Sequence, residues 1–194
     1  MKLLMLLLIT TILTNDYTAV VEAHRKQKNE DFRVEGKSPL LTKKERKKFV
    51  ALHYFTVDEQ YKVVAKYLPL AQEDTLEFMT SSGKIKMFAQ VATLQFTLQG
   101  QSLSLPAYQG IEIRKKPGNE KHLFIPFTDG TTGAESYGAG RYLDLELPEG
   151  DTLTLDFNYA YNPLCAYTSG YSCPIPKPAS RLPVRIEVGE KVYH

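Results

Sequence analysis

The stretch ATLQFTLQGQSLSLP, residues 92–106, decides the fold class, because apolar and polar side chains alternate along it. Leu94, Phe96 and Leu98 fall on one face of an extended chain, and the residues between them are glutamine and threonine. Such alternation is typical of β-structure with one face in a core and the other in water or along a cavity. The stretch therefore predicts strands rather than a helix.

Six further segments have the composition of strands. Two of them alternate in the same way, and the others are rich in leucine, aromatic and β-branched residues. They are YKVVAKYLPL (61–70), TLEFMT (75–80), HLFIPF (122–127), RYLDLEL (141–147), DTLTLDFNY (151–159) and RLPVRIEVGEK (181–191). Many short strands in succession are typical of antiparallel folds. We therefore expect a mainly β protein, an antiparallel β-sandwich or barrel-like domain preceded by a short N-terminal helix.

The short helix is expected near residue 38, where the sequence offers a start signal. Ser38 can cap the first turn, and Pro39 suits the first helical position. The basic run 43–48 that follows is expected to be a solvated helix face, with binding to a membrane surface or a polyanion as the alternative. Residues 38–194 show no internal repeat and no linker, so they are expected to form a single β-rich domain.

The overall composition is that of an ordinary globular protein. Of the 194 residues, 43% are hydrophobic and 24% are charged, which suits one domain with a substantial core. The net charge of +2 is small, so we expect no nucleic-acid partner.

The first residues have the pattern of a secretory signal. A single lysine, Lys2, precedes the apolar run 3–13, which is too short for a bilayer that needs about 20 residues. Val21 and Ala23 then stand where a signal peptidase reads small side chains. We predict a cleavable signal peptide over residues 1–23 and no stable membrane span after its removal. An uncleaved anchor is the alternative.

The processed chain is expected to be exported, either to the periplasm or as a secreted protein. Residues 24–37 are polar and predict a flexible leader. An exported chain can keep its cysteines oxidised, and its only two, Cys165 and Cys173, close a short loop. We predict a disulfide worth about 2.5 kcal/mol in the chain-entropy model. Free thiols and shared metal ligation are the alternatives, and we predict no metal site, because zinc cysteines usually stand closer in sequence.

The segment FTDGTTGAESYGAGRYLD, residues 127–144, is a glycine-rich loop followed by a predicted strand. Dinucleotide-binding and phosphate-binding loops open a helix, so this pattern excludes both. Arg141 shares its strand face with three leucines, and a guanidinium on an apolar face needs a partner. We expect Arg141 to be buried and paired with an anionic ligand or with a carboxylate, the candidates being Asp129, Glu135 and Asp156.

The stretch DFNYAYNPLCAYTSGYSCPIP, residues 156–176, concentrates four tyrosines, two asparagines and both cysteines, and three interpretations fit it. In the first, a pocket binds a small polar or anionic ligand through a few convergent polar groups. The predicted lining residues are Asp129, Glu135, Tyr137, Arg141, Asp156, Asn158, Tyr161 and Asn162.

The second interpretation is a hydrolytic enzyme. Asp129, Glu135 or Asp156 would act as acid and base, with Cys165 as nucleophile or as part of a metal site. A nucleophilic cysteine needs a base, and only folding could bring His53 or His122 near it. In the third interpretation the motif is a structural corner without a small-molecule site. The sequence identifies no cofactor.

Joined motifs in the second half resemble those of a known family. They are PFTDGTTG, GRYLD, DFNYAYNPLCAY, CPIPK and GEK, at residues 126–133, 140–144, 156–167, 173–177 and 189–191. Residues 38–191 are thus similar to the bacterial family called domain of unknown function 1684. The resemblance implies a single domain, often exported, and carries no established activity. The family usually has a Glu-Asn pair where this chain has Ala179 and Ser180, so a carboxylate and an amide are missing there.

Overall fold

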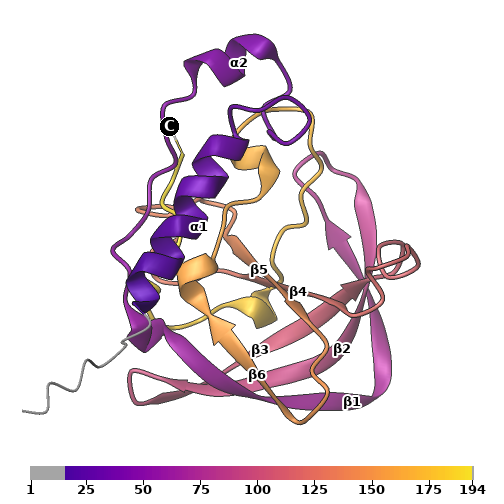
Figure 1. The fold of residues 1–194 in the computed structure, drawn as a ribbon. Helices are drawn as coiled ribbons and strands as arrows, with labels where there is room; N and C mark the ends of the chain where they lie inside the picture. The colour runs from indigo at the N-terminus through magenta and orange to yellow at the C-terminus, as the bar shows by residue number, and fades with distance from the viewer. Residues whose placement is uncertain (1–15, 194) are drawn as a thin grey trace, which may run out of the picture.

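The computed structural model describes residues 16–193. Six strands form one antiparallel sheet in the order β5-β4-β3-β2-β1-β6, and the sheet curls around its core as a half-barrel (Figure 1). The strands are β1 (Lys62–Met79), β2 (Ile85–Leu98), β3 (Gln101–Gly110), β4 (His122–Phe127), β5 (Arg141–Glu146) and β6 (Thr152–Asp156). The predicted mainly β, barrel-like antiparallel fold is therefore confirmed.

Two helices precede the sheet, and short 3-10 helices flank the strands. The helices are α1 (Tyr17–Asp31) and α2 (Lys43–Lys48). The 3-10 helices are η1 (Glu59–Tyr61), η2 (Phe157–Tyr159), η3 (Leu164–Ala166) and η4 (Pro178–Ser180).

The stretch 92–106 forms most of the hairpin of β2 and β3. Leu98 pairs with Gln101 across a two-residue turn, in which Gln99 and Gly100 have φ angles of 50° and 74°. Two consecutive left-handed residues give a turn whose twist matches that of the strands. The leucines of both strands then face the core, where four of them lie buried: Leu94, Leu98, Leu103 and Leu105.

Strand β1 joins two segments that the sequence suggests are separate strands, 61–70 and 75–80. It pairs with β2 on both sides of a shift in register between Pro69 and Asp74. Proline lacks the N–H that a regular ladder uses, so an irregularity is expected beside it.

Residues 181–191 alternate like a strand but do not join the sheet. The alternation correctly marks burial, because Leu182 and Ile186 are 1% and 0% exposed. Their backbone groups bond elsewhere: the Leu182 N–H donates to the Thr128 carbonyl, and the Ile186 carbonyl accepts from Arg141. Loop and side-chain partners thus replace a neighbouring strand.

The helix expected at Ser38 begins later. α2 starts after Thr42, whose hydroxyl accepts from the Glu45 N–H while the Glu45 carboxylate accepts from the Thr42 N–H. This reciprocal capping box fixes the start, and the Ser38 hydroxyl instead donates to the Phe32 carbonyl. α2 has no buried residue, and its four lysines are exposed, as expected for a basic helix face.

Helix α1 lies against one side of the domain, beside the C-terminal segment (Figure 1). It includes residues 24–31, which belong to the segment 24–37 that the sequence analysis expects to be a flexible leader. Val21 and Arg25 are its buried residues, and the Tyr17 hydroxyl donates to Asp156. One buried apolar side chain creates no helical periodicity, so the sequence pattern does not predict this helix. No helix within residues 16–193 is long and apolar enough to cross a membrane.

Candidate functional site

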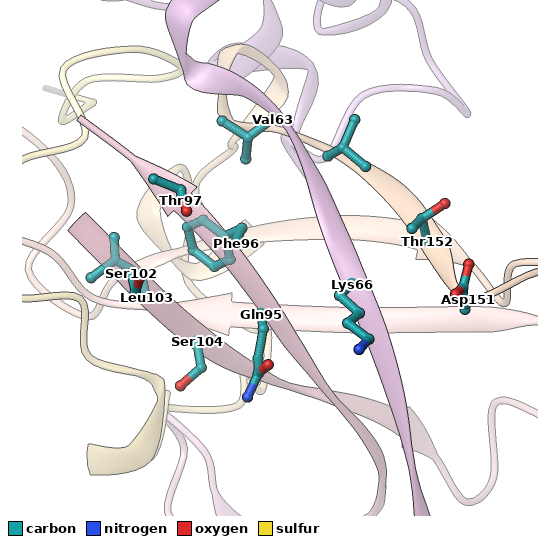
Figure 2. Close-up of a pocket in the computed structure, with 11 residues that line it drawn as sticks. Val63, Lys66, Gln95, Phe96, Thr97, Ser102, Leu103, Ser104, Asp151 and Thr152 are labelled. Atoms are coloured by element: carbon teal, nitrogen blue, oxygen red, sulfur yellow. The ribbon is translucent and has the colours of Figure 1, made fainter. Parts of the chain in front are cut away.

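One hollow, about 830 Å³, lies along β1, β2 and β3 near the start of β6 (Figure 2). Lys66 and Asp151 are its charged residues, and neither histidine nor cysteine lines it. Lys66, Gln95 and Ser104 are cross-strand partners and form a polar row across β1, β2 and β3. Ligand sites usually combine an apolar lining with convergent polar groups, a combination that this hollow lacks.

A second hollow, about 400 Å³, lies between the sheet and residues 161–174. Five aromatic residues line it, and four of them form a series of neighbouring rings: Phe88, Phe124, Tyr142 and Tyr161, with Tyr171 as the fifth. Successive ring centroids in that series are 5.3, 4.7 and 5.8 Å apart, which is the range of favourable aromatic contact. This hollow is termed the aromatic pocket.

The pairing of β4 with β5 explains why polar and aromatic side chains meet there. Phe124 pairs with Asp144, and His122 lies two residues from Phe124 on the same face. His122 and Asp144 are therefore diagonal neighbours, close enough for their side chains to meet. Tyr142 shares this face, while Arg141 lies on the opposite, core side of β5.

His122, Asp144 and Tyr161 form a hydrogen-bonded group in the aromatic pocket. His122 Nε2 lies 2.9 Å from Asp144 Oδ1, and the Tyr161 hydroxyl donates to Asp144 Oδ2. The hydrogen bond with Asp144 raises the pKa of His122, against an opposing effect of burial. Burial, together with the charge of Asp144, raises the pKa of Tyr161, so that its hydroxyl keeps its proton at neutral pH.

Lys86 lines the same pocket from β2. Its ammonium group donates to the Ser172 carbonyl at 2.7 Å. No carboxylate within residues 16–193 forms an ion pair with it. The pocket therefore has a cation without a counter-charge beside the His122–Asp144 pair.

A model of the family described as protein of unknown function (DUF1684) matches residues 47–191. The chain belongs to this family. A similar solved structure is the solution NMR structure of the uncharacterized protein from gene locus rrnAC0354 of Haloarcula marismortui. The two chains are 36% identical, the match covers 92% of this chain and 95% of that one, and the TM-score is 0.67. The search of curated proteins finds no match.

In this DUF1684 domain, Arg141 and Asp129 form an ion pair on the core side of β5. Arg141 Nη2 lies 2.9 Å from Asp129 Oδ2, and both side chains are at most 1% exposed. The guanidinium also donates to the carbonyls of Ile186, Val188 and Glu190. Burial lowers the pKa of Arg141, and Asp129 opposes that effect. The predicted burial and carboxylate pairing of Arg141 are confirmed, and the pair lies outside the aromatic pocket.

The other predicted lining residues do not gather in one cavity. Tyr161 is the member of that set that lines the aromatic pocket. Two of the others lie in the glycine-rich loop, where Glu135 forms an exposed pair with Arg185 and Tyr137 is half-buried. Asp156 accepts a hydrogen bond from Tyr17, and Asn158 donates to the backbone of Asp58. Asn162 lies beside Glu190.

Cys165 and Cys173 form the predicted disulfide, with Cα atoms 6.2 Å apart. The sulfur of Cys165 is therefore not a free nucleophile in this DUF1684 domain. Cys173 lines the aromatic pocket, so the bridge fixes part of the pocket wall. No group of three or more metal-binding side chains occurs among residues 16–193.

Sequence reasoning missed most of this DUF1684 pocket, including Lys86, His122 and Asp144. Part of the signal was present, because alternation in RYLDLEL places Asp144 on the strand face opposite Arg141. The remaining information is the register between β4 and β5, which brings His122 to Asp144. A single sequence does not specify that register.

Proposed function

We propose that this domain binds a small molecule with a planar apolar body and an anionic group in the aromatic pocket. The supporting observation is one hollow that combines four contacting rings with two basic side chains, Lys86 and His122. Small-molecule sites have such a mostly apolar lining and volumes of about 300–1,000 Å³. The hollow, at about 400 Å³, falls within that range.

The charges of the pocket favour an anion over a cation. Both oxygens of Asp144 already accept hydrogen bonds, one from Tyr161 and one in the contact with His122. Lys86 has only a backbone carbonyl as its hydrogen-bond partner within residues 16–193. A ligand carboxylate beside Lys86 would form a charge-assisted hydrogen bond, whereas a ligand ammonium would meet a like charge.

Benzoate and benzamide are matched probes, because they share a ring and differ in charge. We expect benzoate to shift the NMR signals of Phe124 and Tyr161 more than benzamide does at equal concentration. Lys86→Met should remove this preference, because it keeps an extended side chain and loses the charge. Lys66→Met, in the other hollow, is the control and should keep the preference. Benzoate that shifts no pocket signal at millimolar concentration would contradict the proposal.

A second candidate function is hydrolysis, favoured by the 2.9 Å contact between His122 and Asp144. A carboxylate that orients a histidine can prepare it as a general base. Because Cys165 is bonded to Cys173, water would be the nucleophile. The test is turnover of a panel of esters and amides. Activity that disappears in His122→Gln and persists in Lys66→Met would favour hydrolysis over binding alone.

We also propose that the chain is exported to the periplasm or secreted, with residues 1–23 removed as a signal peptide. The disulfide supports export, because such bonds persist in oxidising compartments. The proposed cut falls inside α1 and would remove the contacts of Tyr17 and Val21. N-terminal sequencing of protein recovered outside the cytoplasm should return His24. A chain that starts at Met1, or is found in the cytoplasm alone, would refute this proposal.

A further inference from the structure

Glu190, in the GEK motif, is a buried carboxylate whose charge is balanced by helix α1. It is 1% exposed, and its Oε2 accepts from the Asn162 N–H at 2.9 Å and from the Tyr167 hydroxyl. Its Oε1 lies 2.7 Å from the ammonium nitrogen of Lys28. An unpaired buried charge is very unfavourable, so Glu190 requires a cation at this position.

An aromatic face completes the surroundings of the Lys28 ammonium. Its nitrogen lies 4.8 Å from the centroid of the Tyr161 ring, within the range of a cation–π contact. A carboxylate and a ring face together are the groups that recognise an ammonium ion. The contact with Glu190 is an ion pair by distance but not an aligned hydrogen bond. Lys28 thus occupies a position that a better-aligned ammonium could take.

A hollow of about 370 Å³ opens beside this group and connects it to the surface. Lys28, Tyr161, Asn162 and Tyr171 are among its lining residues. Asn162 is 1% exposed, and its Oδ1 accepts no hydrogen bond from residues 16–193. A buried carbonyl oxygen without a donor is costly, so a ligand N–H placed there would be stabilised.

The helix that carries Lys28 is held to the domain by polar contacts and by its C-cap residue Phe32, which packs against Phe49 and Tyr167. Val21 is its one buried apolar residue. The other contacts include the Tyr17 hydroxyl on Asp156 and the Arg25 guanidinium on the Phe55 carbonyl. Elements with few buried apolar contacts open at a low free energy compared with a core strand. The Lys28 side chain is also 25% exposed, so it can move away from Glu190 without global unfolding.

We propose that Glu190, Tyr161 and Asn162 form a binding site for a primary alkylammonium ion, and that Lys28 fills it from within the chain. A small amine enters through the adjacent hollow and takes the place of the Lys28 ammonium. The site takes a cation and shares Tyr161 and Tyr171 with the wall of the aromatic pocket. Its charge comes from Glu190, which does not line the aromatic pocket, so the proposal does not depend on the function proposed above.

The test is chemical rescue of Lys28→Ala in the full chain. This substitution leaves Glu190 without its cation and opens space next to the hollow. Propylammonium should then raise the melting temperature of the variant by about 3–6 °C at ten times its Kd. The alcohol 1-propanol has the same size and no charge, and sodium chloride controls for ionic strength. Neither should have a comparable effect.

Two further variants separate a specific site from general stabilisation. Adding Glu190→Gln to Lys28→Ala removes the carboxylate and should abolish the rescue. Lys28→Met fills the space with apolar atoms, so propylammonium should not raise the melting temperature of this variant either. If Lys28→Ala does not fold by itself, recovery of its folded circular-dichroism spectrum with propylammonium, and not with 1-propanol, gives the same comparison. Equal effects of propylammonium and 1-propanol, or rescue that persists without the Glu190 carboxylate, would overturn the proposal.

Discussion

Strand β5 separates two pairs, each of a basic side chain and an aspartate, that differ in burial and in their neighbours. On its core side, the side chains of Arg141 and Asp129 are at most 1% exposed. On its other side, those of His122 and Asp144 are 25% and 42% exposed and border the aromatic pocket. The comparison shows how burial decides whether such a pair joins segments of the core or lies at the wall of a pocket.

The two pairs also differ in what they bind together. Arg141 donates to one carboxylate and to three backbone carbonyls of the segment 186–190. Asp129 in turn accepts from the Ile186 N–H at 3.2 Å. The core-side pair therefore supplies hydrogen bonds to a segment that has no neighbouring strand. The pocket-side pair forms no such bonds to that segment.

Removing the core-side pair should have the largest effect on stability. Arg141→Met leaves Asp129 buried without its cation, and three carbonyls lose a donor. Breaking a buried pair in this way costs about 3–5 kcal/mol. We expect the free energy of unfolding, measured with urea, to fall by that amount.

Arg185→Met is the matched control for that measurement. Arg185 pairs with Glu135 at the surface, where the side chains are 48% and 45% exposed. Exposed pairs of this kind contribute about 0–1 kcal/mol. An equal loss of unfolding free energy in Arg141→Met and Arg185→Met would contradict the expectation that the buried pair contributes more to stability than the exposed one.

Removal of the disulfide, which lies on the pocket side of β5, should have an intermediate effect on the free energy of unfolding. It closes a short loop within the segment that walls the aromatic pocket. Replacing both Cys165 and Cys173 with serine should lower the free energy of unfolding by about 2.5 kcal/mol. Urea unfolding of the oxidised protein and of the double variant measures this. Two titratable thiols in unreduced, unfolded protein would show instead that the bond does not form.

The core side of the molecule could largely be predicted from the sequence, because its determinants are local. Alternation over residues 92–106 fixes which side chains are buried without any knowledge of strand order. The cost of an unpaired guanidinium likewise predicts a partner for Arg141 from its strand face alone. The same reasoning marked residues 181–191 as buried, and it erred only in expecting strand partners for their backbone.

The pocket side and α1 depend on contacts between distant parts of the chain. Tyr17 and Asp156 are 139 residues apart, and neither residue type indicates the other. The His122–Asp144 contact follows from the register of β4 against β5, and that register is set by the packing of the whole sheet. Such information is absent from the local pattern of a single sequence, which explains why the candidate site was mostly missed.

The smallest expected effect is the pH dependence that the pocket-side pair adds to stability. The hydrogen bond with Asp144 raises the pKa of His122 above its ordinary value of 6.5. A group whose pKa is higher in the folded state stabilises that state when it is protonated. Its contribution is therefore complete below about pH 6.5 and is lost as the pH rises through the pKa of the folded state.

We expect the difference in unfolding free energy between wild type and His122→Gln to be largest near pH 5.5 and to shrink toward about pH 8.5. Solvent screens this partly exposed pair, so the change should stay within about 1 kcal/mol. His24, whose pKa is lowered by burial, is present in both proteins and cancels in the difference. Urea unfolding across this range, with an NMR titration of the His122 ring, measures the effect. A difference that grew with pH would mean that burial outweighs Asp144. His122 would then be neutral in the pocket, and the preference for an anionic ligand would rest on Lys86 alone.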